Sequence, residues 1–448
     1  MIEESYLADV RAQYEQFPFP NRRAEDEGGR LVVSEVDRLA KIDHHCFDGR
    51  RDYREPMRIL IAGGGTGDAL VYLAEQLRDC PCEFVYLDLS QASMATAQAR
   101  MEARGLRGVR WVQGSILEIP GLDLGRFDYI NCVGVLHHLA DPDAGLGCLR
   151  GALTDDGGMG LMVYGRHGRR HVYVVQEMMK LLCADDPSLA SRLQTTRSTL
   201  TDLSGSGVVA IGAEMAEKLG SPEFDTYLVD TYLHQQDRPY SAGEIHALLT
   251  GQGLHLSSFT NFFSSGGLAT PLDYDPTLYF SDPTLIEHAR RLSRADRHQL
   301  AEILCSTLSM HAFYASAAPK AGASLTDVSL APYFPSKLGF ELGEAAGAGT
   351  LETLDVTFQS GLAKKFRLTP VMQAVVAFID GRRPTRELAT LAMAACPDMS
   401  RDVVVRQVMD GLDLLLGLGV MLLRDPDLPP LERQLDGAGW TGSINWRR

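Results

Sequence analysis

The sequence contains no apolar run that approaches the roughly 18 residues needed to cross a membrane. Residues 1–6 are acidic and lack the basic and apolar regions of a secretory signal peptide. Positive charge is also scarce, since the net charge of the 448 residues is −15. This charge argues against broad nonspecific binding of nucleic acid, although a local basic groove remains open. We therefore expect a cytoplasmic protein that makes no membrane contact.

Cysteines are few and scattered. Of the eight, only Cys80 and Cys82 are close together, and no second pair follows at the spacing of a zinc site. His44 and His45 are adjacent, so they point in different directions on a helix or a strand. We therefore expect reduced, structural cysteines and no metal site. A role for the two histidines at the mouth of a substrate site stays open.

What the chain does contain is an ordinary globular composition, with 45% apolar and 23% charged residues. Its length suffices for two or three domains. Between residues 58 and 164, strand-like apolar runs alternate with helical segments. These runs are residues 58–62, 83–88, 109–113, 127–133 and 159–164. The alternation predicts a parallel sheet with helices on both faces.

The first of these strands runs into a glycine-rich turn. Gly63, Gly65 and Gly67 precede a helix that starts near Asp68. Glycine permits positive φ and lets a ligand approach the backbone N–H groups closely. The next strand ends in Asp88, about 20 residues further on, where an acid can bond both ribose hydroxyls. Together these features predict a nucleoside-binding βαβ unit, and the alternative is a buried strand whose last acid caps the next helix.

Five motifs then occur in the order of a known family. They are residues 62–67, Asp88, residues 114–116, residues 134–139 and residues 157–159. Because of this order, residues 55–165 resemble a class I S-adenosylmethionine-dependent methyltransferase of the type 12 kind, with a weaker likeness up to residue 316. The resemblance implies an α/β fold with a seven-stranded, doubly wound, Rossmann-like sheet. Its seventh strand, at residues 308–316, should be antiparallel.

The resemblance also implies S-adenosylmethionine (SAM) as the cofactor and assigns residues to it. Asp88 should hold the ribose hydroxyls, and Leu89 should pack on the adenine. Ser115 departs from the family, which often has an aspartate there to accept from the adenine amino group. The full set of implied cofactor residues is Gly63, Gly64, Gly65, Gly67, Asp68, Asp88, Leu89, Ser115, Ile116, Val133 and Gly134.

The chemistry of a sulfonium methyl group sets what the protein must do. The methyl group is intrinsically electrophilic, so the protein mainly aligns it with a nucleophile for direct in-line attack. A base is needed only where the acceptor is protonated at neutral pH. His137 and His138 are the catalytic candidates, because histidine titrates near that range. The alternative for both is a structural or substrate-lining role.

Three segments are candidates for the acceptor site. An N-terminal arm, residues 1–54, carries aromatic side chains and prolines at residues 14–20 and can be a lid or a surface arm. A basic patch at residues 165–173 can hold a carboxylate or a phosphate. A helical insertion at residues 184–240 completes the set. The substrate-site candidates are Tyr14, Arg166, Arg169, Tyr232 and His234. The acceptor is expected to be a small molecule or a peptide or protein side chain.

A second unit is expected at residues 331–427, after a linker at residues 317–330. Three helices and a short β element resemble a winged helix in pattern only. The mixed charge argues against DNA binding and favours a homodimer or the docking of a partner. Residues 428–448 should form a flexible tail. The alternative function is a regulator that senses SAM while this unit binds DNA or protein.

Overall fold

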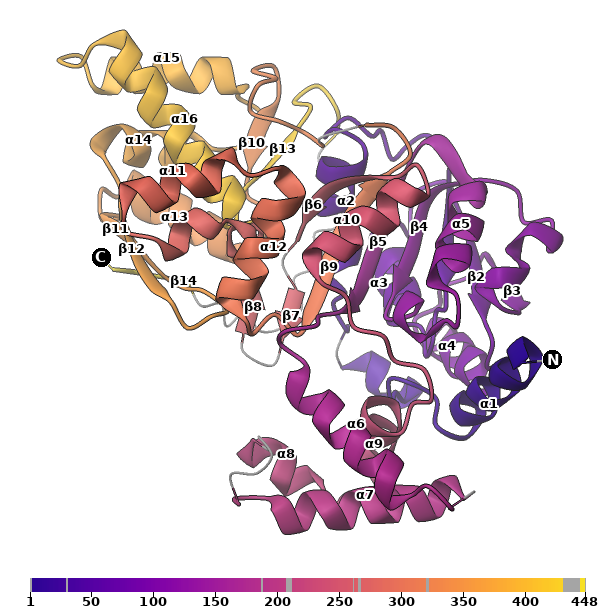
Figure 1. Ribbon diagram of the computed structural model, residues 1–448. Coiled ribbons are helices and arrows are strands. Elements are labelled where there is room, and N and C mark those ends of the chain that lie inside the picture. Colours follow the sequence, from indigo (N-terminus) through magenta and orange to yellow (C-terminus); the bar gives the residue numbers. More distant parts are fainter. Residues whose placement is uncertain are drawn as a thin grey trace.

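The computed structural model describes residues 2–29, 31–186, 188–206, 212–260, 262–264, 267–319, 322–429 and 444–447. Its centre is a seven-stranded sheet (Figure 1). In spatial order the strands are β3 (Val109–Gln113), β2 (Cys82–Asp88), β1 (Met57–Ala62), β4 (Phe127–Val133), β5 (Leu153–Tyr164), β9 (Met310–Ser316) and β6 (His255–Phe259). Neighbouring strands pair in parallel except β9, which is antiparallel to β5 and to β6. The predicted Rossmann-like sheet with an antiparallel seventh strand is confirmed.

Helices cover both faces of this sheet (Figure 1). One face packs against α5 (Pro142–Ala152) and α10 (Ala242–Gly251). The other face packs against α2 (Leu39–Cys46), α3 (Asp68–Gln76) and α4 (Gln91–Ala103). Side chains alternate along a strand, so in β1 Leu60 belongs to the first core and Ile61 to the second. The strands are apolar runs because both faces are buried.

The helical region at residues 283–305 is interrupted. It forms two helices, α11 (Pro283–Arg291) and α12 (Arg294–Cys305). The break occurs because Leu292 is extended and Ser293 caps α12, its hydroxyl accepting from the backbone N–H of Asp296. The elements between β6 and α11 are β7 (Phe262–Ser264), β8 (Gly267–Ala269), η6 (Pro271–Tyr274) and η7 (Pro276–Tyr279).

Two further segments are irregular. A 3-10 turn, η2 (Glu35–Asp37), precedes α2, because Arg38 is extended between them. β5 begins at Leu153, earlier than the strand expected at residues 159–164, and it shifts register against β4 between Leu153 and Gly158.

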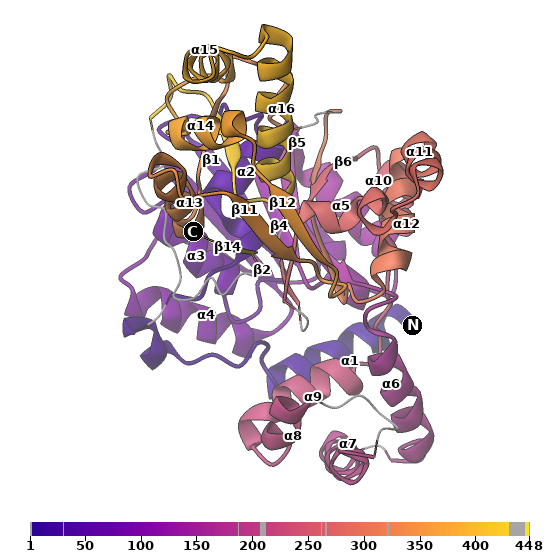
Figure 2. The ribbon, with the colours of Figure 1, turned by 90° about the vertical axis from the view of Figure 1, so that its left-hand side faces the viewer.

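The N-terminal arm begins with a helix. That helix, α1 (Ile2–Gln16), ends before Pro18, because proline does not fit a helix interior. A short 3-10 helix, η1 (Ala24–Gly28), follows the proline-rich segment. α1 lies beside the helical insertion (Figure 2), to which the hydroxyl of Tyr14 donates a hydrogen bond.

The insertion is helical, as predicted, and projects from one end of the sheet (Figures 1 and 2). Its elements are α7 (Leu189–Leu203), α8 (Ala213–Lys218), η5 (Pro222–Phe224) and α9 (Asp225–Tyr232), and α6 (Arg170–Leu182), which precedes it, packs against them. Together they have an apolar core of their own, in which Val172, Leu200 and Leu228 are buried. Residues 207–211 of the insertion lie outside the described residues.

The C-terminal unit has a separate apolar core. Its helices are α13 (Lys337–Gly347), α14 (Pro370–Phe378), α15 (Thr385–Ala395) and α16 (Arg401–Gly417). Its strands are the pair β10 (Ala331–Tyr333) and β13 (Leu422–Arg424), and the sheet β12 (Ala363–Arg367), β11 (Thr353–Thr357) and β14 (Ile444–Arg447). α13 and the β11–β12 hairpin were not predicted. The winged-helix assignment stays a prediction, as do a homodimer and partner docking.

Two expectations about chain connections were wrong. Leu325 and Leu330 of the expected linker are buried in the C-terminal core, and the backbone N–H of Ala323 bonds the carbonyl of His44 at 2.7 Å. The expected tail at residues 428–448 includes β14, which pairs with β11, while residues 430–443 lie outside the described ranges. The C-terminal unit is therefore docked on α2 rather than tethered.

Within the described ranges, no helix is long and apolar enough to cross a membrane. No group of three or more His, Cys, Asp or Glu side chains in these ranges is arranged to hold a metal ion. The eight cysteines are free thiols.

Candidate active site

A cavity of about 410 Å³ opens at the carboxyl ends of β1, β2 and β4. This is the edge at which open α/β sheets bind ligands. The predicted cofactor residues in its wall are Gly63, Gly64, Gly65, Asp68, Asp88, Leu89, Ser115, Ile116, Val133 and Gly134. Gly67 is not in the wall, because it precedes α3 as its N-cap, with φ 94°. The structure thus brings together residues that are up to 71 positions apart in the sequence.

The glycine turn is shaped by its own backbone and by the N-terminal arm. Gly65 has φ 52°, in the left-handed region that favours glycine. A Cβ atom there would lie 2.6 Å from the carbonyl oxygen of Phe19. Thr66 holds the same segment, donating from its backbone N–H to Phe19 and from its hydroxyl to the carbonyl of Pro20 at 2.7 Å. The arm therefore forms part of the cavity wall.

Replacing Gly65 with alanine should displace this segment. We expect Gly65→Ala to lose about 1–2 kcal/mol of stability from the left-handed backbone and to bind S-adenosylhomocysteine (SAH) more weakly. Urea unfolding and calorimetric titration measure the two effects. Gly105→Ala is the matched control, because Gly105 has φ 63° and no atom within 4 Å of its Cβ position. Equal SAH affinities of the two variants would contradict the close approach of Phe19.

Asp88 lies at the end of β2, beside the glycine turn. Its Oδ2 atom accepts from the backbone N–H of Gly65 and its Oδ1 atom from that of Ser90, both at 2.8 Å. Burial raises the pKa of Asp88, and these two bonds oppose that shift. Each carboxylate oxygen keeps a second lone pair, so the side chain can still accept from two neighbouring hydroxyls.

A buried polar cluster also lines the cavity. Asp230, on α9, accepts from the hydroxyl of Tyr14 at 3.0 Å and from that of Tyr164 at 3.4 Å. All three side chains belong to the cavity wall. Burial raises the pKa of Asp230, which is 3% exposed. This part of the wall is therefore built by α1, β5 and the insertion together.

The two candidate catalytic histidines have different positions. His138 lines the cavity, and its Nδ1 atom lies 2.8 Å from the carbonyl oxygen of Gln236. Only a protonated Nδ1 can donate to a carbonyl, so in the neutral ring Nε2 is left with a lone pair. Burial lowers the pKa of His138 to about 4, so the ring is neutral at pH 7.

His137 is fully buried and is not part of the cavity wall. Its ring packs between those of His138 and Tyr164, with centroid distances of 4.2 and 3.9 Å. Neither ring nitrogen has a hydrogen-bond partner among the described residues. Burial lowers the pKa of His137 well below its ordinary value. This position suits packing rather than proton transfer to a substrate.

Comparison with known proteins identifies the central domain. A family model described as a methyltransferase domain matches residues 60–159, which contain the glycine turn, Asp88 and His138. Residues 60–159 form a methyltransferase domain. Its cofactor is SAM, and the cavity fits that group because Asp88 has acceptor sites left beside the glycine turn that lines it.

Similar proteins match different shares of this methyltransferase. An uncharacterized protein of Synechococcus sp. is 28% identical over 321 residues, which is 71% of this chain and 73% of that protein. A non-reducing polyketide synthase of Emericella nidulans is 32% identical over 103 residues, 22% of this chain and 4% of that protein. The structure of PKMT2 from Rickettsia typhi in complex with AdoHcy has a TM-score of 0.53 and 13% identity, over 87% of this chain and 74% of that one. This likeness shows the fold.

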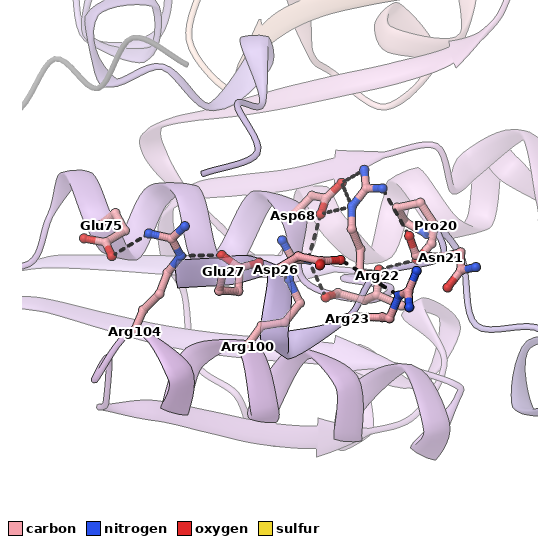
Figure 3. Close-up of polar contacts among 11 residues, drawn as sticks. Pro20, Asn21, Arg22, Arg23, Asp26, Glu27, Asp68, Glu75, Arg100 and Arg104 are labelled. Carbon is pink, nitrogen blue, oxygen red and sulfur yellow. Dashed lines mark hydrogen bonds and ion pairs between the residues drawn. The ribbon is translucent and has the colours of Figure 1, made fainter. Parts of the chain in front are cut away.

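Asp68 of the methyltransferase domain forms ion pairs with two arginines. It bonds Arg22 and Arg100, each at 2.7 Å (Figure 3). Burial alone would raise the pKa of Asp68, but these ion pairs outweigh it and lower the pKa. Glu27 forms ion pairs with Arg100 and Arg104, and these pairs hold η1 against α4. The network fixes the N-terminal arm against the glycine turn.

The other predicted substrate residues lie outside the cavity wall. Arg166 pairs with Glu244 at 2.6 Å on the surface. Arg169 lies over the ring of Tyr164 at 3.4 Å and pairs with Asp237. The ring of His234 stacks on His138 at 3.9 Å, and Tyr232 is buried in the core of the insertion. Arg169 and His234 thus support cavity residues from behind.

Sequence reasoning missed Asp230, Tyr164 and Asn131, which line the cavity. Asp230 falls in the insertion segment from which Tyr232 and His234 were chosen. The available signal was an acid two residues before Tyr232, on the short helix α9. That helix turns Asp230 towards α1.

Proposed function

We propose that this methyltransferase transfers a methyl group to a nucleophilic atom of a small molecule or of a peptide or protein side chain, by direct in-line attack. SAM supplies the electrophilic methyl group. The observation that carries the proposal is one cavity whose wall contains both the glycine turn with Asp88 and the polar side chains of Tyr14, His138 and Asp230. We assign the first group to the cofactor end and the second to the acceptor end, because the reaction requires a nucleophile aligned with the methyl group.

In this proposal a few side chains each bind one part of the nucleoside. Asp88 accepts from both ribose hydroxyls. Leu89 and Ile116 enclose the adenine. The hydroxyl of Ser115 already accepts from the backbone N–H of Leu117 at 3.2 Å, so its own proton is left to donate to a ring nitrogen. The glycine turn, Val133 and Gly134 border the methionyl part.

At the acceptor end, His138 accepts the proton that the nucleophilic atom of the acceptor loses. Its Nε2 atom is the basic one, and the low pKa keeps it unprotonated at neutral pH. Asp230 holds the hydroxyls of Tyr14 and Tyr164 in fixed directions, so it orients the groups that the acceptor meets. His137 and His234 keep the ring of His138 in place by stacking.

Transfer of labelled methyl groups tests this function. The purified protein is incubated with methyl-labelled SAM and a fractionated cell extract, and label is sought in small-molecule and in protein fractions. We expect one class of fraction to gain label. If SAH binds and yet no fraction gains label, the enzymatic proposal fails and the alternative, a SAM-sensing regulator, replaces it.

Asp88→Ala tests the nucleoside end. The variant loses two charge-assisted bonds to the ribose, so we expect SAH to bind about 5- to 150-fold more weakly, the equivalent of about 1–3 kcal/mol. Isothermal titration calorimetry measures the change. Asp143→Ala, at an exposed acid outside the cavity, serves as the control and should bind SAH like the wild type. Wild-type affinity in Asp88→Ala would remove Asp88 from the site.

A further inference from the structure

A second cavity, of about 180 Å³, lies where the C-terminal unit meets the methyltransferase domain. Its polar wall consists of Lys41, His44 and His45 from α2, Ser257 and Ser258 from β6, Thr260 just after β6, and Asp413 from α16. The two adjacent histidines therefore lie here and not at the mouth of the cofactor cavity. A volume near 30 Å³ per liquid water makes this space large enough for more than isolated structural waters.

Two hydroxyl groups in this wall lack partners. Ser257 is 3% exposed and Thr260 is 2% exposed. Neither hydroxyl has a hydrogen-bond partner within the part of the chain that the structure describes. A buried hydroxyl without a partner is unfavourable, and buried polar groups in native proteins are generally satisfied. A polar molecule in the cavity would supply the missing acceptor.

The inner wall is rich in donors. Lys41 is 4% exposed, and its ammonium group lies 2.9 Å from the Oε2 atom of Glu35. The Nδ1 atom of His44 accepts from the backbone N–H of Leu423 at 3.0 Å, so Nε2 carries the proton of the neutral ring. With the two hydroxyls, these groups match a carboxylate, which can accept several hydrogen bonds.

The outer side of the cavity has the opposite character. Asp413 is exposed, and it lies in the C-terminal part of α16, whose last residue, Gly417, also lines the space. The carboxyl end of a helix carries partial negative charge. This side therefore favours a cation.

We propose that the junction cavity binds a small zwitterion of amino-acid size, with its carboxylate on Ser257 and Thr260 and its ammonium group towards Asp413. The ion pair of Lys41 and Glu35 then connects two sites, because Glu35 lines the cofactor cavity. Occupancy of the junction changes the partners of Lys41 and so the wall of the cofactor cavity. Coupling between two binding sites is reciprocal. The coupling between the two cavities rests on the proposed cofactor site, and the binding of the zwitterion does not.

Binding of ω-amino acids to the full chain without cofactor tests the first part. The probes are glycine, β-alanine and γ-aminobutyrate. Acetate carries only the carboxylate half of such a molecule, and methylamine only the ammonium half. We expect at least one zwitterion to bind by calorimetry, and each half to bind at least tenfold more weakly. The combined Ser257→Ala and Thr260→Val variant, and Asp413→Asn, should each lower the affinity at least tenfold. Asp402→Asn, at the start of the same helix and outside the cavity, should not.

Failure of every zwitterion to bind would mean that the cavity holds water only and would overturn the proposal. Binding that the Ser257, Thr260 and Asp413 variants leave unchanged would also overturn it. For the coupling, SAH is titrated with and without the bound probe. The fold-change in SAH affinity should equal the fold-change in probe affinity caused by SAH. An unchanged SAH affinity in the presence of the probe would refute the coupling alone.

Discussion

His138→Ala should lower the rate of methyl transfer about 100- to 10,000-fold, the range expected for loss of a general base. The affinity for SAH should stay close to that of the wild type, because the imidazole lies at the acceptor end and not beside Asp88. The same base sets the pH dependence. Since the pKa of His138 is lowered to about 4, the ring is neutral above that pH and charged below it. The wild-type rate should therefore be flat from pH 6 to 8 and should fall as the pH drops towards 4.

The control for this variant is His171→Ala, which removes an exposed histidine at the start of α6, outside the cavity. It should transfer methyl groups at the wild-type rate. A wild-type rate in His138→Ala would show that the acceptor needs no base from this residue. An equal loss of rate and of SAH affinity would instead indicate that the ring supports the fold of the whole cavity.

Arg100→Leu should lower the free energy of unfolding by about 3–5 kcal/mol, the usual effect of breaking a buried ion pair. Arg100 is fully buried and bonds Glu27, the carbonyl of Thr66 and Asp68 at once. Its loss leaves two carboxylates short of a partner and weakens the attachment of η1 to α4, where the pair of Arg104 and Glu27 remains. Urea unfolding measures the change in stability.

Arg107→Leu provides the comparison, because Arg107 is exposed and surface changes stay within about 0.5 kcal/mol. The Arg100 variant should also bind SAH more weakly, since the network holds the arm against the glycine turn (Figure 3). A loss of stability no larger than that of Arg107→Leu would show that the buried network is not what holds the arm.

The sequence alone was enough for the parallel sheet and for placing the glycine turn and Asp88 together in the wall of one cavity. Local patterns specify both: β3 and β4 have the predicted bounds, and the glycine turn and Asp88 lie within one βαβ unit. The capping box of Ser241 and Glu244 at the start of α10 is likewise a local pattern. Each of these features depends on residues that are close together in the chain.

The acceptor end could not be predicted in the same way. Tyr14 and Asp230 are 216 residues apart, and only the docking of α1 against the insertion brings them together. Arg166 and Arg169 looked available in the sequence, but Glu244 and Asp237 neutralise them in the fold. Charge in a segment does not reveal its partner when the partner comes from a distant element.

The C-terminal unit shows the same limit for secondary structure. The β11–β12 hairpin is short, and Lys364 and Lys365 interrupt its apolar pattern, so pairing with the rest of the unit decides its conformation. The linker was expected to be free because it is small and polar, yet Leu325 and Leu330 fill the C-terminal core.

The most direct test of the central claim is a structure of the protein with SAH bound. We expect the nucleoside in the 410 Å³ cavity, with its ribose hydroxyls on Asp88, and the sulfur facing the end formed by Tyr14, His138 and Asp230. Absence of SAH binding, or a nucleoside placed away from Asp88, would contradict the account.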